Sequence, residues 1–205
     1  MSSLTKTYYT PEQYLALERE AEYRSEYING QIYPMNGQPY AMSGASEEHN
    51  LIVVNVLREV SVQFKGRPCK VYVTDMRVKV SPTGMYTYPD IVAVCNKPHF
   101  EDERVDTLLN PTVIIEVLSP STEAYDRGDK FAHYRKLASL TDYVLVSQNT
   151  ARVEHYVRHS EGSGQWVLTE ISGSDGVLRL ISIGCEVALK DVYDKVNLQE
   201  GGPGH

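Results

Sequence analysis

Two acidic residues stand within strongly apolar stretches of the sequence. Asp90 precedes the apolar run 91–95, and Glu116 lies near the end of the run 112–118. Burying a carboxylate without a partner is costly, so two such residues call for a nearby cation. Mg²⁺ suits this role because it binds about two carboxylates and leaves positions open for phosphate oxygens. The alternative is structural: Asp90 caps a strand, and Glu116 pairs with an arginine or a lysine.

The segment after Glu116 supplies a candidate amine. The residues 119–122, Ser-Pro-Ser-Thr, stop the apolar run and predict the start of a helix that ends near Ala138. Asp126, Lys130 and Tyr134 follow at positions i, i+4 and i+8, so they share one face of this helix. If the helix packs over the sheet, Lys130 can approach Glu116. In the alternative, Asp126 and Lys130 form an exposed ion pair worth about 0.3–0.5 kcal/mol.

Three further residues are secondary candidates. Glu26, in a predicted hairpin, either adds a third carboxylate or forms a salt bridge at a strand edge. His49 steps along the inward face of a predicted helix, where a hydrogen-bonded histidine is more common than a metal ligand. Asp75 lies where the alternation of a strand slips, and it either points into the site or caps a bulge there.

Buried strands are needed to position these groups. The runs 91–95, 112–118 and 143–146 are apolar on both faces, which is typical of the middle of a sheet covered by helices. The first two are expected to be neighbours. The segment 69–80 is expected to form one strand with a β-bulge near Asp75, since its alternation changes parity there.

Helices and turns complete the predicted α/β core. Helices are expected over 10–19 and from Ser46 to about Phe64, and Asn29-Gly30 predicts a tight hairpin turn. The segments 152–158, 165–171 and 178–189 are typical of antiparallel strands, with a short helix near Asp191. The predicted fold class is therefore a mixed sheet flanked by helices, with a C-terminal antiparallel β extension.

The chain is expected to form a single domain over residues 1–196. Its core would span about 20–147 and its β extension about 150–190, with a disordered tail over 197–205 that is rich in glycine. We find no internal repeat and no linker long enough to separate two domains.

Composition narrows the class of protein. With 205 residues, 41% hydrophobic and 23% charged, the sequence is typical of a soluble globular protein. The net charge of -7 disfavours binding to a polyanion through bulk charge. One stretch from Arg58 to Lys79 carries a local balance of +4, which predicts either a basic binding surface or an ordinary solvated face.

Location and cysteine chemistry also follow as expectations. No apolar run is long enough for a membrane span, and residues 1–6 lack the pattern of a secretory signal, so we expect a cytoplasmic protein. Cys69, Cys95 and Cys185 are odd in number and widely spaced, which favours buried thiols over bridges or zinc ligands.

The sequence resembles a bacterial restriction-endonuclease-like family, a domain of unknown function within the PD-(D/E)XK nuclease superfamily. The resemblance covers about residues 8–195. It rests on Pro89-Asp90 and on the segment 111–122 around Glu116, and it continues through Asp126, Lys130 and Tyr134. Weaker points of resemblance are the segment 26–30, His49 and the segment 75–78.

The resemblance implies a metal-dependent endonuclease that hydrolyses DNA phosphodiesters in the presence of Mg²⁺ or Mn²⁺. Asp90, Glu116 and the main-chain carbonyl of Val117 would bind the metal, and a lysine would assist hydrolysis. The superfamily lysine follows its acid by two residues, and here that position is Leu118. Our hypothesis is that Lys130 replaces it from the next helix.

Two alternatives stay open. In one, the chain is a catalytically silent module that binds nucleic acid or protein on the same fold. In the other, Asp90, Glu116 and Lys130 form a buried charge network in an assembly protein. For the nuclease, a homodimer is expected, because a two-fold axis would match the symmetry of a DNA duplex.

Overall fold

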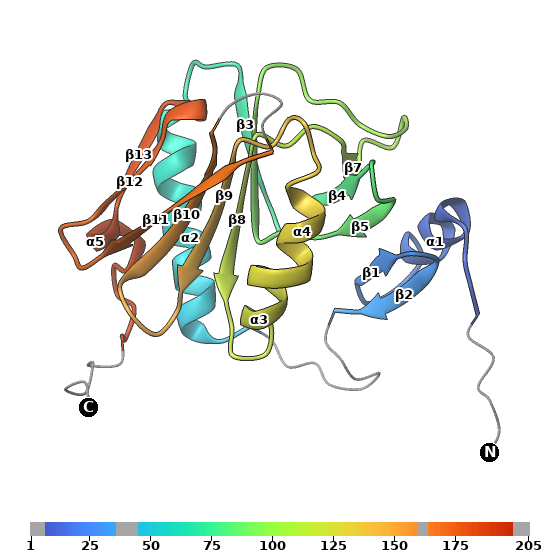
Figure 1. Cartoon of the computed structure of the whole chain (residues 1–205), viewed down its shortest axis with the longest axis horizontal. Helices are drawn as coiled ribbons and strands as arrows, with labels where there is room; N and C mark the ends of the chain where they lie inside the picture. Colours follow the sequence, from blue (N-terminus) through green and yellow to red (C-terminus); the bar gives the residue numbers. More distant parts are fainter. Residues whose placement is uncertain (1–6, 36–44, 160–163, 199–205) are drawn as a thin grey trace.

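The computed structural model describes residues 7–35, 45–159 and 164–198. Its main sheet orders six strands as β11-β10-β9-β8-β6-β3 (Figure 1). β8 and β9 are parallel, whereas the other neighbouring pairs are antiparallel, so the sheet is mixed, as predicted. The strands are β3 (Cys69–Val73), β6 (Ile91–Cys95), β8 (Val113–Leu118), β9 (Asp142–Ser147), β10 (Arg152–Arg158) and β11 (Trp166–Ser172).

A second sheet orders five strands as β2-β1-β5-β4-β7. These strands are β1 (Ser25–Ile28), β2 (Gln31–Pro34), β4 (Arg77–Val80), β5 (Met85–Thr87) and β7 (Thr107–Leu108). Val78 and Met85 from this sheet pack with Val94 and Ile114 from the main sheet in one core cluster. The second sheet therefore covers part of one face of the main sheet. A small hairpin of β12 (Val177–Leu180) and β13 (Cys185–Ala188) completes the C-terminal β extension.

Helix α2 (Glu47–Gln63) covers the opposite face of the main sheet. Ser46 caps it by accepting a hydrogen bond from the amide of His49, as the sequence predicted. Ile52, Val56 and Val60 are buried against strand residues and the β12–β13 hairpin. The other helices are α1 (Pro11–Glu18), α3 (Glu123–Tyr125), a π-helical turn (Asp126–Lys130), α4 (Phe131–Tyr134), a 3₁₀ turn (Ile181–Ile183) and α5 (Leu189–Val192). None of the helices within the described ranges is long and apolar enough to cross a bilayer.

The predicted helix cap and hairpin turn near the N-terminus are confirmed. Thr10 and Gln13 form a reciprocal capping box at the start of α1. Asn29 and Gly30 connect β1 to β2 with φ values of 50° and 82°, the left-handed backbone that this turn requires.

The prediction of one bulged strand over 69–80 is wrong. β3 ends at Val73, a turn follows in which the amide of Met76 donates to the carbonyl of Val73 at 2.9 Å, and β4 begins at Arg77 in the other sheet. Val71 packs in the core beneath α2, whereas Val78 packs between the two sheets. The change of parity therefore marks a passage from one sheet to the other.

Two element boundaries also differ from the prediction. The helix expected to reach Ala138 ends at Tyr134, and a π-helical turn interrupts it. The segment 178–189 folds back on itself as β12 and β13. Of the tail expected to be disordered, residues 199–205 lie outside the described residues.

The cysteine prediction is wrong for two residues. Cys69 and Cys95 face each other in the β3–β6 register and form a disulfide, whereas Cys185 is a buried free thiol, as predicted. Opposite residues of antiparallel strands lie within disulfide reach. The sequence did not reveal this pairing, because the two residues are 26 positions apart and only the register of β3 with β6 brings them together.

An ion cluster fastens α1 to the second sheet. Arg19 donates to Asp106 at 2.8 and 3.0 Å, and Nη2 of the buried Arg77 lies 3.0 Å from the same carboxylate. Hydrogen bonds from Arg19, followed by the charge of Arg77, lower the pKa of Asp106. Its contribution to stability is therefore complete above the unfolded pKa of about 4 and is lost as the pH falls.

We expect Asp106→Asn to lower the free energy of unfolding by about 1–2 kcal/mol at pH 7, because one third of the Asp106 side chain remains exposed and solvent screens the pair. The loss should shrink near pH 3, because there the carboxylate takes up a proton in the unfolded chain, whereas the lowered pKa keeps it ionised in the folded protein. Urea denaturation at both pH values measures this. Asp102→Asn, at a more exposed partner of Arg19, is the matched control and should cost less. An equal loss at both pH values would contradict the role of the charge.

Candidate active site

Asp90 and Glu116 lie side by side at the ends of two central strands. In the β6–β8 register Ile91 pairs with Ile115, which confirms that these strands are neighbours and makes the next residues, Asp90 and Glu116, adjacent. The amide of Asp90 donates to Oε2 of Glu116 at 3.3 Å. β8 ends beside α3 at the lower edge of the molecule in Figure 1, so both acids lie at this end of the sheet.

One oxygen of Asp90 is anchored by the protein. Oδ2 accepts a hydrogen bond from the amide of Val117 at 2.8 Å and lies 3.2 Å from Nε2 of His49. The other oxygen, Oδ1, has no hydrogen-bond partner among the residues that the structure describes, and Asp90 lines a cavity. His49 is thus brought to the site as a neighbour of Asp90.

The main-chain carbonyl of Val117 faces the same carboxylate. In an extended strand the N–H and C=O of one residue point to the same edge. Since the N–H of Val117 points to Asp90, its C=O points to the β6 edge as well. The ladder between β8 and β6 begins only at the pair of Ile91 and Ile115, so Val117 lies beyond it.

Lys130 reaches Glu116, as the spacing on its helix predicted. Its Nζ lies 2.9 Å from Oε1 of Glu116, 3.3 Å from Oδ1 of Asp126 and 3.9 Å from Oε1 of Glu26. Lys130 is only 6% exposed, so this is a buried charge cluster and not the surface pair that the alternative described. The π-helical turn runs from Asp126 to Lys130, and such turns often occur at functional sites.

Tyrosine and threonine hydroxyls hold the carboxylates. The hydroxyl of Tyr134 donates to Oε1 of Glu116 at 3.0 Å, and the hydroxyl of Tyr125 donates to Oε2 of Glu26 at 2.9 Å. Thr87 donates to the other oxygen of Glu26. Glu26 and Thr87 come from the second sheet, so both sheets contribute to the site.

Burial governs the electrostatics of the cluster. Desolvation raises the pKa of Glu116 to about 8, since it outweighs the attraction of Lys130. Burial also raises the pKa of Asp126. For Lys130, burial acts to lower the pKa, but the carboxylates, with Glu116 first, raise it well above its usual value. The amine therefore keeps its charge, and the pKa of Glu116 stays above the ordinary carboxyl range even beside Lys130.

A cavity of about 1140 Å³ opens over these groups. Its floor contains Asp90, Glu116 and Lys130, and hydroxyl-bearing residues of the loop after β8 form part of its wall. Within that loop, Oγ of Ser119 lies 3.0 Å from Oγ of Ser121 and 2.9 Å from Oγ1 of Thr122. The residues 119–122 predicted the position of this loop, but no sequence signal beyond its place in the helix pointed to Tyr125.

Asp75 is not part of this arrangement. It lies in the turn between β3 and β4, its side chain is 77% exposed, and it pairs with Arg24. The parity slip that singled out Asp75 reflects the change of sheet, so no bulge aims this side chain into the site.

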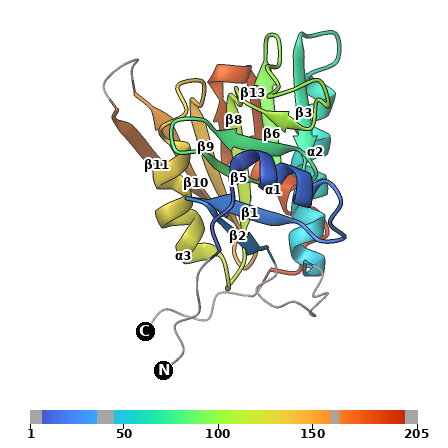
Figure 2. The same ribbon diagram turned by 90° about the vertical axis from the view of Figure 1, so that its right-hand side faces the viewer.

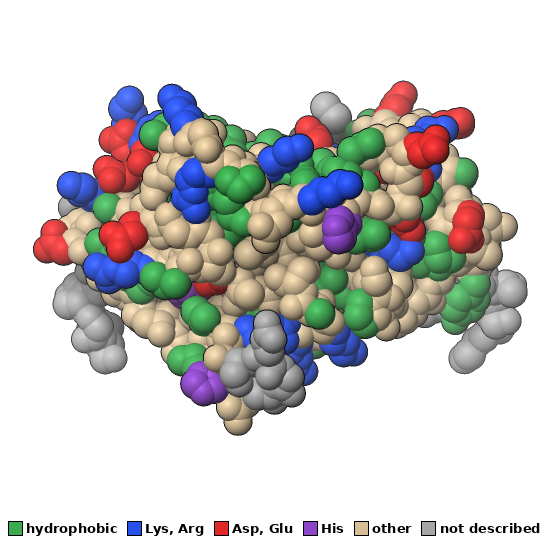
Figure 3. Space-filling view, turned by 90° about the horizontal axis from the view of Figure 1, so that it is seen from above, with side chains coloured by type: hydrophobic (Ala, Val, Ile, Leu, Met, Phe, Trp, Pro, Cys, Tyr) green, Lys and Arg blue, Asp and Glu red, His purple; other side chains and the backbone are tan. Residues whose placement is uncertain are grey.

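The cations of the 58–79 stretch do not form one basic surface. Arg77 is buried against Tyr88 and Asp106, and Lys79 pairs with Glu101. Arg67 donates to the carbonyls of Ile183 and Gly184, and Arg58 pairs with Glu59. On the face shown in Figure 3, lysine and arginine side chains lie scattered among acidic and apolar ones. These residues lie apart because the stretch runs from α2 through β3 of the main sheet to β4 of the second sheet.

The oxygen donors of this site suit a hard divalent cation that takes few ligands from the protein and keeps water in its other positions. No cluster of three or more His, Cys, Asp or Glu residues in the described ranges is arranged to hold a metal ion. The set here consists of two carboxylates, Asp90 and Glu116, with the carbonyl of Val117. Mg²⁺ commonly binds through one or two carboxylates and retains water in its other positions, so oxygen donors of this kind suit it.

The fold is similar to that of a solved structure. A crystal structure described as a putative nuclease belonging to DUF820 from Anabaena variabilis ATCC 29413 superposes with a TM-score of 0.70 and 20% identity. The match covers 90% of this chain and 97% of the other. This similarity confirms the predicted restriction-endonuclease-like mixed α/β fold.

The family follows from the sequence comparison. Residues 11–190 match the family model described as "Uma2: Putative restriction endonuclease", so the chain belongs to this family. Two proteins of Synechocystis sp., described as uncharacterized proteins sll1609 and slr1290, are 36% and 35% identical over 166 and 184 residues. These matches cover 81% and 90% of this chain, and 89% and 90% of the relatives.

We expect Lys130→Met to destabilise the protein by about 3–5 kcal/mol at pH 8, because it leaves Glu116 and Asp126 buried without their cation. In the variant the carboxyl pKa values lie above their unfolded values, so its stability should fall as the pH rises from about 4.5 toward 8. Urea denaturation at pH 5 and pH 8 measures this. Lys70→Met, at an exposed lysine of β3, is the control. Wild-type stability of Lys130→Met at pH 8 would refute the buried cluster.

Proposed function

We propose that this protein is a metal-dependent endonuclease that hydrolyses phosphodiester bonds of DNA. The observation that carries the proposal is the contact of 2.9 Å between Lys130 and Glu116, next to Asp90 at the adjoining strand end and beneath one cavity. Two carboxylates can hold a divalent cation, and a neighbouring amine can stabilise the negative charge that develops on a phosphate. Membership of the family described as "Putative restriction endonuclease" supports the same assignment.

Each residue of the site would have its own role, set by its position. Asp90, Glu116 and the carbonyl of Val117 would hold Mg²⁺ or Mn²⁺. When bound, such an ion polarises the scissile phosphate and lowers the pKa of a bound water. Val117 and His49 anchor Oδ2 of Asp90, whereas Oδ1 has no hydrogen-bond partner among the described residues, and Asp90 lines the cavity. Tyr134 and Asp90 orient the two oxygens of Glu116 through hydrogen bonds.

Lys130 would take the role of the lysine that is absent at Leu118. Leu118 is buried in the core between the two sheets, so its side chain has no part in the site. Lys130 stays charged and lies within reach of the carboxylates that face the cavity. Such an amine can orient the attacking water and stabilise the negative charge that develops on the phosphate.

A second candidate function is a catalytically silent binding module. One observation favours it: Lys130 is already engaged by Glu116 and Asp126, as in a closed charge network. In this case the cluster would stabilise the fold and the cavity would bind DNA or protein without chemistry. Metal uptake and cleavage distinguish the two functions.

For the nuclease, we expect the wild-type protein to cut single-stranded, duplex or branched DNA with Mg²⁺ or Mn²⁺. Asp90→Asn, Glu116→Gln and Lys130→Ala should each reduce the cleavage rate by roughly 10²–10³-fold or more, because each removes a group that acts on the reacting phosphate. Gel assays at a temperature where each variant keeps the wild-type circular dichroism measure this.

The matched control for cleavage is Asp129→Asn. Asp129 lines the same cavity but is exposed, and it lies one residue before Lys130. It should retain the wild-type rate. DNA left uncut by the wild-type protein with both metals would count against the nuclease, and full activity of Lys130→Ala would remove the role given to that lysine.

Metal uptake provides an independent test by calorimetry with Mn²⁺. The wild-type protein should bind the ion, Glu116→Gln and Asp90→Asn should lose binding, and Lys130→Ala should keep it. Binding should strengthen as the pH rises toward about 8, since the ion displaces the proton that burial holds on Glu116. No uptake by the wild-type protein, together with salt-sensitive DNA binding, would favour the binding module.

A further inference from the structure

β11 is an edge strand that the described part of the chain leaves uncovered. It stands last in the order of the main sheet and pairs with β10 along seven residues. Figure 2 shows it at the outer edge of the molecule. Five of its seven residues are exposed, although Val167 and Leu168 are apolar and 49% and 51% exposed.

The outer edge of β11 presents a regular row of main-chain donors and acceptors. At one end of the ladder the amide of His159 donates to the carbonyl of Gln165, and at the other the amide of Gly173 donates to that of Ala151. Hydrogen-bonded pairs of antiparallel strands alternate, so the odd-numbered residues of β11 bond to β10. The main chains of the even-numbered residues therefore point outward: Trp166, Leu168, Glu170 and Ser172.

The usual protections of an edge are missing from β11. Natural edge strands are kept short or carry lysine, proline or a bulge, because an open edge pairs with other strands. β11 is seven residues long, contains neither lysine nor proline, and follows β10 in unbroken register. One of its faces carries Val167, Thr169 and Ile171, which are all β-branched and favour strand pairing.

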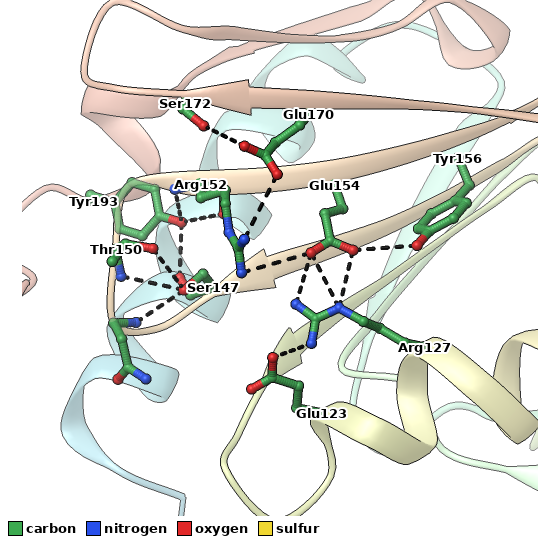
Figure 4. Close-up of polar contacts among 11 residues, drawn as sticks. Glu123, Arg127, Ser147, Thr150, Arg152, Glu154, Tyr156, Glu170, Ser172 and Tyr193 are labelled. Atoms are coloured by element: carbon green, nitrogen blue, oxygen red, sulfur yellow. Dashed lines mark hydrogen bonds and ion pairs between the residues drawn. The ribbon is translucent and has the colours of Figure 1, made fainter. Parts of the chain in front are cut away.

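The one charge of β11 is balanced within the chain. Figure 4 shows Glu170 beside Arg152, whose Nη1 lies 3.7 Å from Oε2 of Glu170, while Ser172 donates to Oε1 at 3.2 Å. Arg152 in turn lies 3.8 Å from Glu154, which also binds Arg127. Acids and arginines thus alternate across this face, so Glu170 presents no unbalanced charge to a partner strand.

We propose that β11 pairs antiparallel with β11 of a second copy of this chain, with Thr169 on the two-fold axis. In this register Trp166 lies opposite Ser172 of the partner subunit, and Leu168 lies opposite Glu170 of the partner subunit. All four outward residues then exchange hydrogen bonds. On the other face, Val167 packs against Ile171 of the partner subunit, and the two Thr169 side chains face each other.

Self-pairing in the neighbouring register is less favourable. A shift that centres the axis on Glu170 places two glutamates directly opposite each other, which is destabilising. A shift that centres it on Leu168 leaves Ser172 outside the ladder. The sequence of β11 therefore complements itself best about Thr169, which is why a second copy is the occupant we assign.

In the proposed dimer the two candidate sites lie at opposite ends of the continuous sheet. The two-fold axis of an antiparallel strand pair stands perpendicular to the sheet, so β8 of one copy runs opposite to β8 of the other. The site lies at the carboxyl end of β8. The two sites would then lie at opposite ends of the joined sheet, which differs from the two-fold match to a DNA duplex that the sequence analysis expects.

The first experiment measures association. An edge pairing of this length is small compared with a stable interface, so we expect a dimer that forms as the concentration of the full chain rises, seen by sedimentation equilibrium. Thr169→Lys places two ammonium groups face to face and should raise the dissociation constant by roughly tenfold or more. Ile181→Lys adds the same charge at an apolar side chain that is 78% exposed on the 3₁₀ turn, and it should leave association unchanged.

The second experiment tests the register. Opposite residues of a non-hydrogen-bonded pair lie within disulfide distance, so Thr169→Cys should form a covalent dimer under mild oxidation. Val167→Cys, on the same face but away from the axis, should crosslink at the background level of the wild-type chain. A wild-type chain that stays monomeric, an unaffected Thr169→Lys variant, or equal crosslinking of the two cysteine variants would each overturn the proposal.

Discussion

Glu116 is a carboxylate buried in the middle strand of the main sheet, and its charge has to be balanced there. Lys130 supplies a cation at 2.9 Å and Tyr134 supplies a hydrogen bond at 3.0 Å. A buried acid with these partners is tolerated, whereas an isolated one would be strongly destabilising. The helical segment 123–134 must therefore lie across the end of β8, and this requirement fixes the architecture around the site.

The rest of the site is assembled about that pair by the two sheets. The main sheet places Asp90 beside Glu116 through the β6–β8 register, and the second sheet brings Glu26 to within 3.9 Å of Lys130. With Asp126, which lies 3.3 Å from Lys130, four acids and one buried amine thus converge from segments that are distant in sequence. Because burial raises the pKa of Glu116, the divalent cation that we propose at this site would displace a proton on binding.

Local patterns in the sequence predicted the groups that lie on continuous elements. Asp90 and Glu116 interrupt apolar strands, and Lys130 shares a helical face with Tyr134, so these positions followed from periodicity alone. Partners across strands could not be foreseen in the same way. The Cys69–Cys95 bridge depends on the register of β3 with β6, and Asp75 was misassigned because a change of sheet and a bulge both shift the parity of a strand.

The most direct test of the central claim is a crystal structure of the protein soaked with Mn²⁺, examined for anomalous scattering at the end of β8. We predict an ion bound by Asp90, Glu116 and the carbonyl of Val117, with Lys130 still beside Glu116. An electron-density map without anomalous scattering at this place, in which Glu116 keeps Lys130 as its sole cation, would contradict it.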